Sequence, residues 1–167
     1  MIINKKNNII LIIIFFVISL SIISALIIEY VLNHKPCSLC LYERIPYFLS
    51  ALLIIKIFFF KKYEKITLLI LFIIFTISTL LAFYHFGIEQ GFFNESFVCN
   101  VENQLTILSK ENLLKELNKN IVSCKDVTFR ILGLSLAAIN TILSVVLSII
   151  FLKLFFNYGS SSTSQYK

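Results

Sequence analysis

Residues 7–28 of this chain carry no charge and are dominated by the run "IILIIIFFVISLSIISALII". A helix needs about 20 mostly apolar residues to cross a hydrocarbon core about 30 Å thick. Two more uncharged stretches of similar length follow, at residues 66–84 and 131–152. Such long continuous apolar runs are typical of membrane helices, which satisfy their own backbone hydrogen bonds, and not of alternating barrel strands. The sequence therefore predicts a helical membrane protein.

A further span is expected between the first two of these stretches. Lys56 interrupts the apolar run "IPYFLSALLIIKIFFF" at residues 45–60, but a lysine so close to Lys61 can extend its side chain to the interface. Since 58% of the residues are hydrophobic and only 14% are charged, an ordinary soluble domain is excluded. We expect an all-α membrane protein, a four-transmembrane-helix bundle in a single domain covering residues 1–167. The expected spans are about 9–29, 42–60, 66–86 and 129–152.

The first span could also be interpreted as a cleaved signal peptide, because Lys5 and Lys6 precede it. Its apolar run exceeds the usual length of about 7 to 15 residues, and no A-x-A-like cleavage site follows. We therefore expect a retained anchor.

The lysines predict the orientation of the bundle. They are concentrated in the amino-terminal tail, the "KKYEK" turn and the tail at residues 153–167, so this side is expected to be cytoplasmic. Loops at about residues 30–41 and 87–128 then lie on the opposite side of the membrane, and the "GSSSTSQYK" end is expected to be disordered. The net charge of +6 therefore reflects topology and gives no support to nucleic-acid binding.

All four cysteines fall in the two loops expected outside the cytoplasm, in an oxidising compartment, with Cys37 and Cys40 in the first loop and Cys99 and Cys124 in the second. Disulfides persist in such an oxidising compartment. Three pairings are possible, and the local one, Cys37 with Cys40 and Cys99 with Cys124, is the simplest.

Other uses of these cysteines fit less well. A structural zinc site usually needs two tight cysteine knuckles, and the chain has one C-x-x-C; haem attachment would need a histidine where Leu41 stands. Two inert structural disulfides remain open, but a C-x-x-C ring is too small to stabilise a fold much by loop closure. Redox chemistry is the more usual purpose of that motif.

Arg44 follows Cys40 by one helical turn, so its guanidinium could stabilise a Cys40 thiolate. The alternative is a simple interface anchor. Pro46 lacks an amide donor, which is harmless only in a first helical turn, and so predicts that the regular helix begins near Arg44 or Ile45.

A dithiol at a membrane surface needs an electron acceptor. The chain has no glycine-rich nucleotide loop, no histidine-rich metal cluster and no room for a flavin domain, so we expect neither a metal nor a nucleotide cofactor. A quinone dissolved in the bilayer needs only a groove between helix ends and a cationic donor, and Arg44 could serve the thiolate and the quinone together.

Four blocks of the sequence resemble the disulfide bond formation protein B (DsbB) family of bacterial inner-membrane oxidoreductases. They are "PCSLCLYERIPYF", "FYHFGIEQGFF", the cysteine at position 99 and "CKDVTFRILGLSLAAIN". The resemblance implies that Cys99 and Cys124 oxidise a periplasmic DsbA-type thioredoxin-fold partner, with Cys99 forming the mixed disulfide. It also implies that Cys124 exchanges with Cys37 and that Cys40 passes electrons to a membrane quinone, either ubiquinone or menaquinone.

The same resemblance implies that Arg44 and His85 bind the quinone. Both termini would be cytoplasmic, and we expect a monomer, because four helices suffice to form the site. From the residues themselves, the apolar spacing between residues 105 and 122 indicates a short helix, on the outer leaflet or on the protein surface. Asn140 is expected to make an interhelical hydrogen bond, with lining of the quinone path as an alternative. Small residues at positions 133 and 135 are expected to permit close helix packing.

Two other functions remain open. Vitamin K epoxide reductase-like enzymes also combine a small helix bundle, loop cysteines and quinone, but their loop pair is expected before the C-x-x-C, whereas here it follows. A non-enzymatic membrane scaffold with two structural disulfides is the other alternative.

Overall fold

A computed structural model of the protein describes four long helices and parts of their connections. The described residues are 5–60, 63–94, 99, 123–125, 130–131 and 133–163. The helices are α1 (Lys5–Tyr30), α2 (Ser38–Phe59), α3 (Glu64–Glu89) and α6 (Leu136–Thr163). Each contains a segment long and apolar enough to cross a membrane. The predicted four-helix membrane bundle is therefore confirmed.

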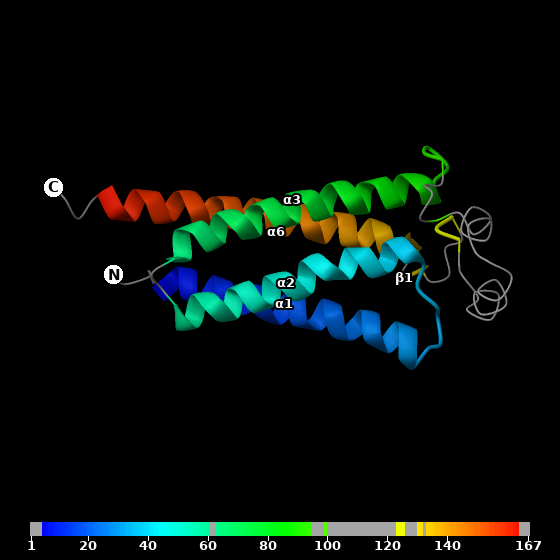
Figure 1. Cartoon of the computed structure of the whole chain (residues 1–167), viewed down its shortest axis with the longest axis horizontal. Helices are drawn as coiled ribbons and strands as arrows, with labels where there is room; N and C mark the ends of the chain where they lie inside the picture. The colour runs from blue at the N-terminus through cyan, green and yellow to red at the C-terminus, as the bar shows by residue number, and fades with distance from the viewer. Residues whose placement is uncertain are drawn as a thin grey trace, which may run out of the picture.

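The helices lie side by side, with both chain termini at one end of the bundle (Figure 1). The last turns of α1 and α3 and the first turns of α2 and α6 lie at the opposite end, where the described cysteines are found. We call this the cysteine end. The helix predicted between residues 105 and 122 lies outside the described residues.

Aromatic and aliphatic side chains from all four helices fill the centre of the bundle. The Phe75 ring stacks on Phe151 with 5.5 Å between centroids, and its edge meets Tyr47 at 5.6 Å. Outward-facing residues are equally apolar: Phe16 on α1 and Leu52 on α2 are 67% and 65% exposed. Because water would penalise such a surface, it indicates that lipid surrounds the bundle.

Helix α2 begins at Ser38, so the predicted start near Arg44 is wrong. Cys37 provides the reason: its backbone is extended and its sulfur accepts a hydrogen bond from the Cys40 amide at 3.3 Å, as an N-cap side chain does. Pro46 therefore lies inside the helix. Membrane helices tolerate an internal proline because neighbouring groups compensate for the lost backbone hydrogen bond.

Helix α6 begins at Leu136, later than the predicted residue 129. Before it, β1 (Arg130–Ile131) and β2 (Leu134–Ser135) form a minimal antiparallel hairpin. Gly133 turns this hairpin with a φ of +85°, and the Ser135 hydroxyl accepts the Ala138 amide at 3.2 Å, which caps α6. A Cβ atom at Gly133 would meet nothing within 4 Å, so the prediction that this glycine permits close helix packing is wrong. Ser135 is buried and caps α6. At its other end α6 continues to Thr163, beyond the predicted start of the tail.

The chain folds back over the end of α3. The amides of Phe92 and Phe93 donate to the Gly87 carbonyl, and the Phe93 ring stacks on Tyr84 at 5.6 Å between centroids. A Cβ atom at Gly87 would lie only 2.2 Å from the Phe93 ring. The glycine therefore allows this ring to cover the helix beside His85.

Candidate redox site

The C-x-x-C motif occupies the first turn of α2. The sulfur atoms of Cys37 and Cys40 lie 2.8 Å apart and are not bonded, so the structure has this pair as thiols where the sequence predicted a disulfide. Sequence alone does not determine the redox state of such a pair. The short separation allows the bond to form with little movement, since a disulfide needs an S–S distance of about 2.05 Å.

Cys99 and Cys124, the second predicted pair, are joined by a disulfide in the structure. Both residues are 2% exposed, and they share one buried cluster with Cys37, Leu39 and Ile88. Two cysteine pairs that are distant in sequence are thus gathered at the cysteine end. This arrangement is suited to exchange of electrons between a disulfide and a dithiol.

His85, near the end of α3, lies between a cysteine and an acid. Its Nε2 atom is 3.5 Å from the Cys37 sulfur, and its Nδ1 atom is 2.7 Å from Oε1 of Glu43. The side chain is only 2% exposed. The resemblance assigned this residue to quinone binding, whereas in the structure it contacts the redox cysteine.

Glu43 connects His85 to a wider set of buried polar groups. Its Oε2 atom accepts a hydrogen bond of 2.7 Å from the Asn140 side-chain amide, and Tyr47 donates to the Asn140 carbonyl oxygen at 2.5 Å. The interhelical hydrogen bond predicted for Asn140 is confirmed. The tyrosine hydroxyl also lies 3.2 Å from Ser144. These bonds join α2, α3 and α6.

The sequence interpretation overlooked Glu43. Glu43 directly precedes Arg44 in the "LYERIPYF" segment, at the edge of the weakest predicted span, and only the arginine was considered for a role in the site. The available signal was an acidic residue within an apolar run, which in membrane proteins usually marks a functional position.

The environment of Cys37 favours its ionised form. Hydrogen bonding to the Cys40 thiol makes the largest contribution and lowers the pKa of Cys37 from 9.0 to about 5, with His85 acting in the same direction against the effect of burial. Cys37 directly precedes the second span. A thiolate at neutral pH is the reactive form in disulfide exchange.

This pKa leads to a measurable prediction. Ultraviolet absorbance of thiolate in the reduced protein is expected to change with a midpoint near pH 5, with thiolate present above that pH and lost below it. His85→Ala should move the midpoint upward, toward 9.0, because one hydrogen bond to the thiolate disappears. Cys37→Ser should remove the transition. A wild-type midpoint near 9.0 would contradict the prediction.

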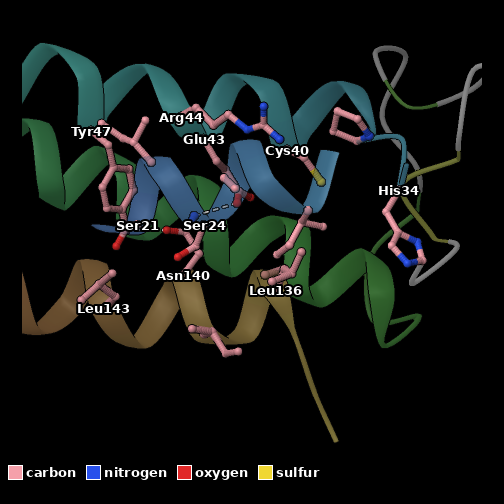
Figure 2. A pocket seen from close by; sticks show the side chains of 16 residues that line it. Ser21, Ser24, His34, Cys40, Glu43, Arg44, Tyr47, Leu136, Asn140 and Leu143 are labelled. Carbon is pink, nitrogen blue, oxygen red and sulfur yellow. Dashed lines mark hydrogen bonds between the residues drawn. The ribbon is translucent and has the colours of Figure 1, made fainter. Parts of the chain in front are cut away.

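A cavity of about 310 Å³ lies between α1, α2 and α6, next to Cys40. Figure 2 shows Cys40, Glu43 and Arg44 on α2 directed toward this space, opposite Asn140 on α6. Its volume is at the small end of the range of about 300–1,000 Å³ for ligand sites. Apolar atoms form most of the wall, and Glu43, Arg44 and Asn140 supply polar groups, which suits a single ring with polar substituents better than a nucleotide. His85 does not line this cavity.

Arg44 lines the cavity and forms an ion pair with Glu29 at the end of α1. The structure pairs this guanidinium with a carboxylate, and stabilisation of a Cys40 thiolate by Arg44 stays a prediction. Only one of its nitrogens is used in the pair, so further N–H donors remain for an acceptor in the cavity. Glu29 was missed as a partner because it is distant in sequence and served only to delimit the first span.

The same residues could hold a metal ion. One ligand atom each from Cys37, Cys40 and His85 lies within 4.8 Å of the others. A thiophilic cation such as Zn²⁺ takes this combination of sulfur and imidazole ligands. Redox assays on the reduced protein therefore require a chelator.

Four apolar helices with a dithiol and a disulfide gathered at one end define a multi-pass membrane protein of thiol–disulfide chemistry. The family model described as Disulfide bond formation protein DsbB matches residues 7–154, and the chain belongs to this family. The chain is also similar to Uncharacterized protein RP370 of Rickettsia prowazekii (strain Madrid E), with 29% identity over 172 residues that cover 97% of this chain and 99% of the relative. Comparison with solved structures gives no match.

Proposed function

We propose that this protein reoxidises a periplasmic thioredoxin-fold dithiol protein of the DsbA type and passes the electrons to a quinone in the bacterial inner membrane. Membership of a disulfide bond formation family supports the thiol–disulfide part of this function. The observation that carries the quinone part is the cavity between α1, α2 and α6, because it brings an apolar space, the Cys40 thiol and the Arg44 guanidinium together.

Three exchanges account for the reaction, and each moves two electrons and two protons. The partner dithiol attacks Cys99, so that the partner becomes a disulfide and Cys99 and Cys124 become thiols. Attack by Cys124 on Cys37 then reduces the Cys37–Cys40 disulfide and restores the first one. Finally Cys37 and Cys40 become a disulfide again, while the quinone takes up two electrons and two protons as quinol.

The polar groups of the cavity fit a quinone better than an inert scaffold. A quinone presents two carbonyl oxygens on an apolar ring, and Arg44 supplies a charged donor at the wall that also holds Cys40. A scaffold with structural disulfides would require neither a thiol pair 2.8 Å apart nor a cationic donor beside it.

The direct test uses the purified full-length chain in lipid nanodiscs that contain ubiquinone. Addition of a reduced DsbA-type protein, with a chelator present, is expected to form one quinol for each partner disulfide. Menaquinone in a second set of nanodiscs establishes which quinone is preferred. Absence of quinol with both quinones would overturn the proposal in favour of a scaffold.

Replacement of Arg44 tests the cation in the cavity. Arg44→Gln is expected to raise the KM for quinone about tenfold to hundredfold, since a hydrogen bond from a charged donor contributes about 1.5–3 kcal/mol. Arg44→Lys should recover only part of this affinity, because one ammonium group serves Glu29 and the quinone poorly at the same time.

The chain offers a matched control for this measurement. Arg130 is the other arginine of the sequence and lies exposed in β1, outside the cavity. Arg130→Gln should leave the KM for quinone unchanged. An equal effect of both substitutions would show that Arg44 acts through net charge and not through the cavity.

A further inference from the structure

Glu43 is an acidic side chain held inside the membrane bundle. It is 6% exposed and belongs to a helix segment that is otherwise apolar enough to span a membrane. A charged group in this position is costly, so its retention usually has a functional reason. The three exchanges proposed above do not use it.

The hydrogen bonds of Glu43 form a continuous connection between the redox cysteine and the cavity. The Cys37 sulfur is 3.5 Å from His85 Nε2, and the opposite ring nitrogen is 2.7 Å from Glu43 Oε1. Glu43 itself lines the cavity next to Cys40. An imidazole can accept a proton at one nitrogen while it releases one from the other, and a carboxylate can then carry that proton further.

We propose that His85 and Glu43 form a proton relay that carries the Cys37 proton to the quinone in the cavity. This inference rests on the proposed function, because it assigns a path to one of the two protons that quinol formation requires.

The step balances as follows. Ionisation of Cys37 breaks its S–H bond and forms an N–H bond at His85 Nε2, so the reduced site holds a thiolate beside an imidazolium. During quinone reduction the proton on Nδ1 passes to the Glu43 carboxylate. That carboxyl group then protonates one quinone oxygen. The Cys37 sulfur bonds to the Cys40 sulfur, and two electrons pass from Cys40 to the quinone. Cys40 lines the cavity, so its proton goes directly to the second quinone oxygen.

Neighbouring groups hold the relay in position. Asn140 donates to the second carboxylate oxygen of Glu43 at 2.7 Å and is in turn held by Tyr47. These two are positioning residues, because they orient Glu43 without contact to the cysteine pair. Glu89 is the competing acceptor, since its carboxylate lies 3.9 Å from His85 Nε2. The geometry favours Glu43, whose 2.7 Å contact is a hydrogen bond and whose side chain also reaches the cavity.

The test measures quinol formation in a single turnover, starting from the reduced protein in quinone nanodiscs. Glu43→Gln preserves the shape and hydrogen-bonding capacity of the side chain but cannot carry the proton. It is expected to slow quinol formation about 100-fold or more, the usual effect of losing a positioned acid or base. Quinone affinity should stay within about twofold, and Glu43→Asp should recover part of the rate. Glu64→Gln makes the same substitution at a buried glutamate at the opposite end of α3 and should leave the rate unchanged.

A second variant keeps the inference falsifiable if Glu43→Gln does not fold. His85→Gln interrupts the relay at its other member and should produce a similar loss of rate. The double variant should lose no more than either single one, because both residues belong to one path. Glu89→Gln should retain the wild-type rate, and a loss in Glu89→Gln alone would assign the proton to a different route and overturn the relay.

The outcomes separate the relay from the proposed function. If the wild type forms quinol and both relay variants keep its rate, the relay is overturned and the proposed function stands. A loss of quinone affinity equal to the loss of rate also overturns the relay, because Glu43 would then only shape the cavity. If the wild type forms no quinol, the proposed function is overturned and the relay with it.

Discussion

Replacement of Cys40 by serine is expected to reduce quinol formation to the rate seen without protein. Cys40 is the cysteine that lines the cavity, and its sulfur lies 2.8 Å from the Cys37 sulfur. A serine hydroxyl keeps the approximate shape and hydrogen bonding but cannot give up electrons to form a disulfide. The measurement is quinol produced by the purified variant in nanodiscs with reduced partner.

This experiment has an internal control in the same helical turn. Ser38→Ala changes a neighbouring residue that carries no redox chemistry and should leave quinol formation within about twofold of the wild type. The Cys40 variant should also become trapped as a mixed disulfide between Cys37 and the second cysteine pair, visible on a non-reducing gel. Persistent quinol formation by Cys40→Ser would refute the assignment of Cys40 as the electron donor.

Removal of the second pair is expected to separate the two halves of the reaction. In the double variant Cys99→Ser, Cys124→Ser, oxidation of the thioredoxin-fold partner should be lost, because its entry disulfide no longer exists. Quinol formation driven by a small dithiol such as dithiothreitol should continue within about threefold of the wild-type rate, since the Cys37–Cys40 pair and the cavity remain.

Loss of a disulfide also lowers stability, by about 3 kcal/mol for a loop of this size, so the thermal midpoint of the variant must be measured beside its activity. A matched control is the wild-type protein assayed with dithiothreitol alone. If the double variant still oxidised the protein partner at the wild-type rate, the partner would react directly with Cys37 and the proposed order of exchange would be wrong.

Much of the architecture was predictable because membrane helices follow from a simple physical requirement. About 20 apolar residues are needed for each crossing, and the four runs that meet it became the four helices. The grouping of Cys99 with Cys124 was also predictable, since both lie in one loop. These features depend on local composition and short separations in the sequence.

The contacts of the site were less predictable because they join distant positions. Glu43 is 42 residues from its hydrogen-bond partner His85 and 97 residues from its other partner, Asn140. Their spacing gives no local periodicity, and only the packing of α2 against α3 and α6 brings them together. The pairing of Arg44 with Glu29 was missed for the same reason.

Helix boundaries were mispredicted where single residues adopt unusual roles. The start of α2 depends on Cys37, which is outside the usual set of capping residues, and Pro46 suggested a later start. The start of α6 depends on the positive φ of Gly133, which fits a turn as readily as a helix–helix contact in a sequence. A proline usually stands in the first turn of a helix and a glycine often lies at a helix–helix contact, so residue type alone favoured both wrong predictions.

The use of Cys37 as a helix cap ties the redox cycle to the backbone. As a thiolate, this sulfur is a strong acceptor for the Cys40 amide, whereas a sulfur in a disulfide is a weak one. Each turnover must therefore weaken and restore the first hydrogen bond of α2. The amide proton of Cys40 thereby becomes a built-in spectroscopic reporter, with a nuclear magnetic resonance frequency that distinguishes the oxidised protein from the reduced one without any added label.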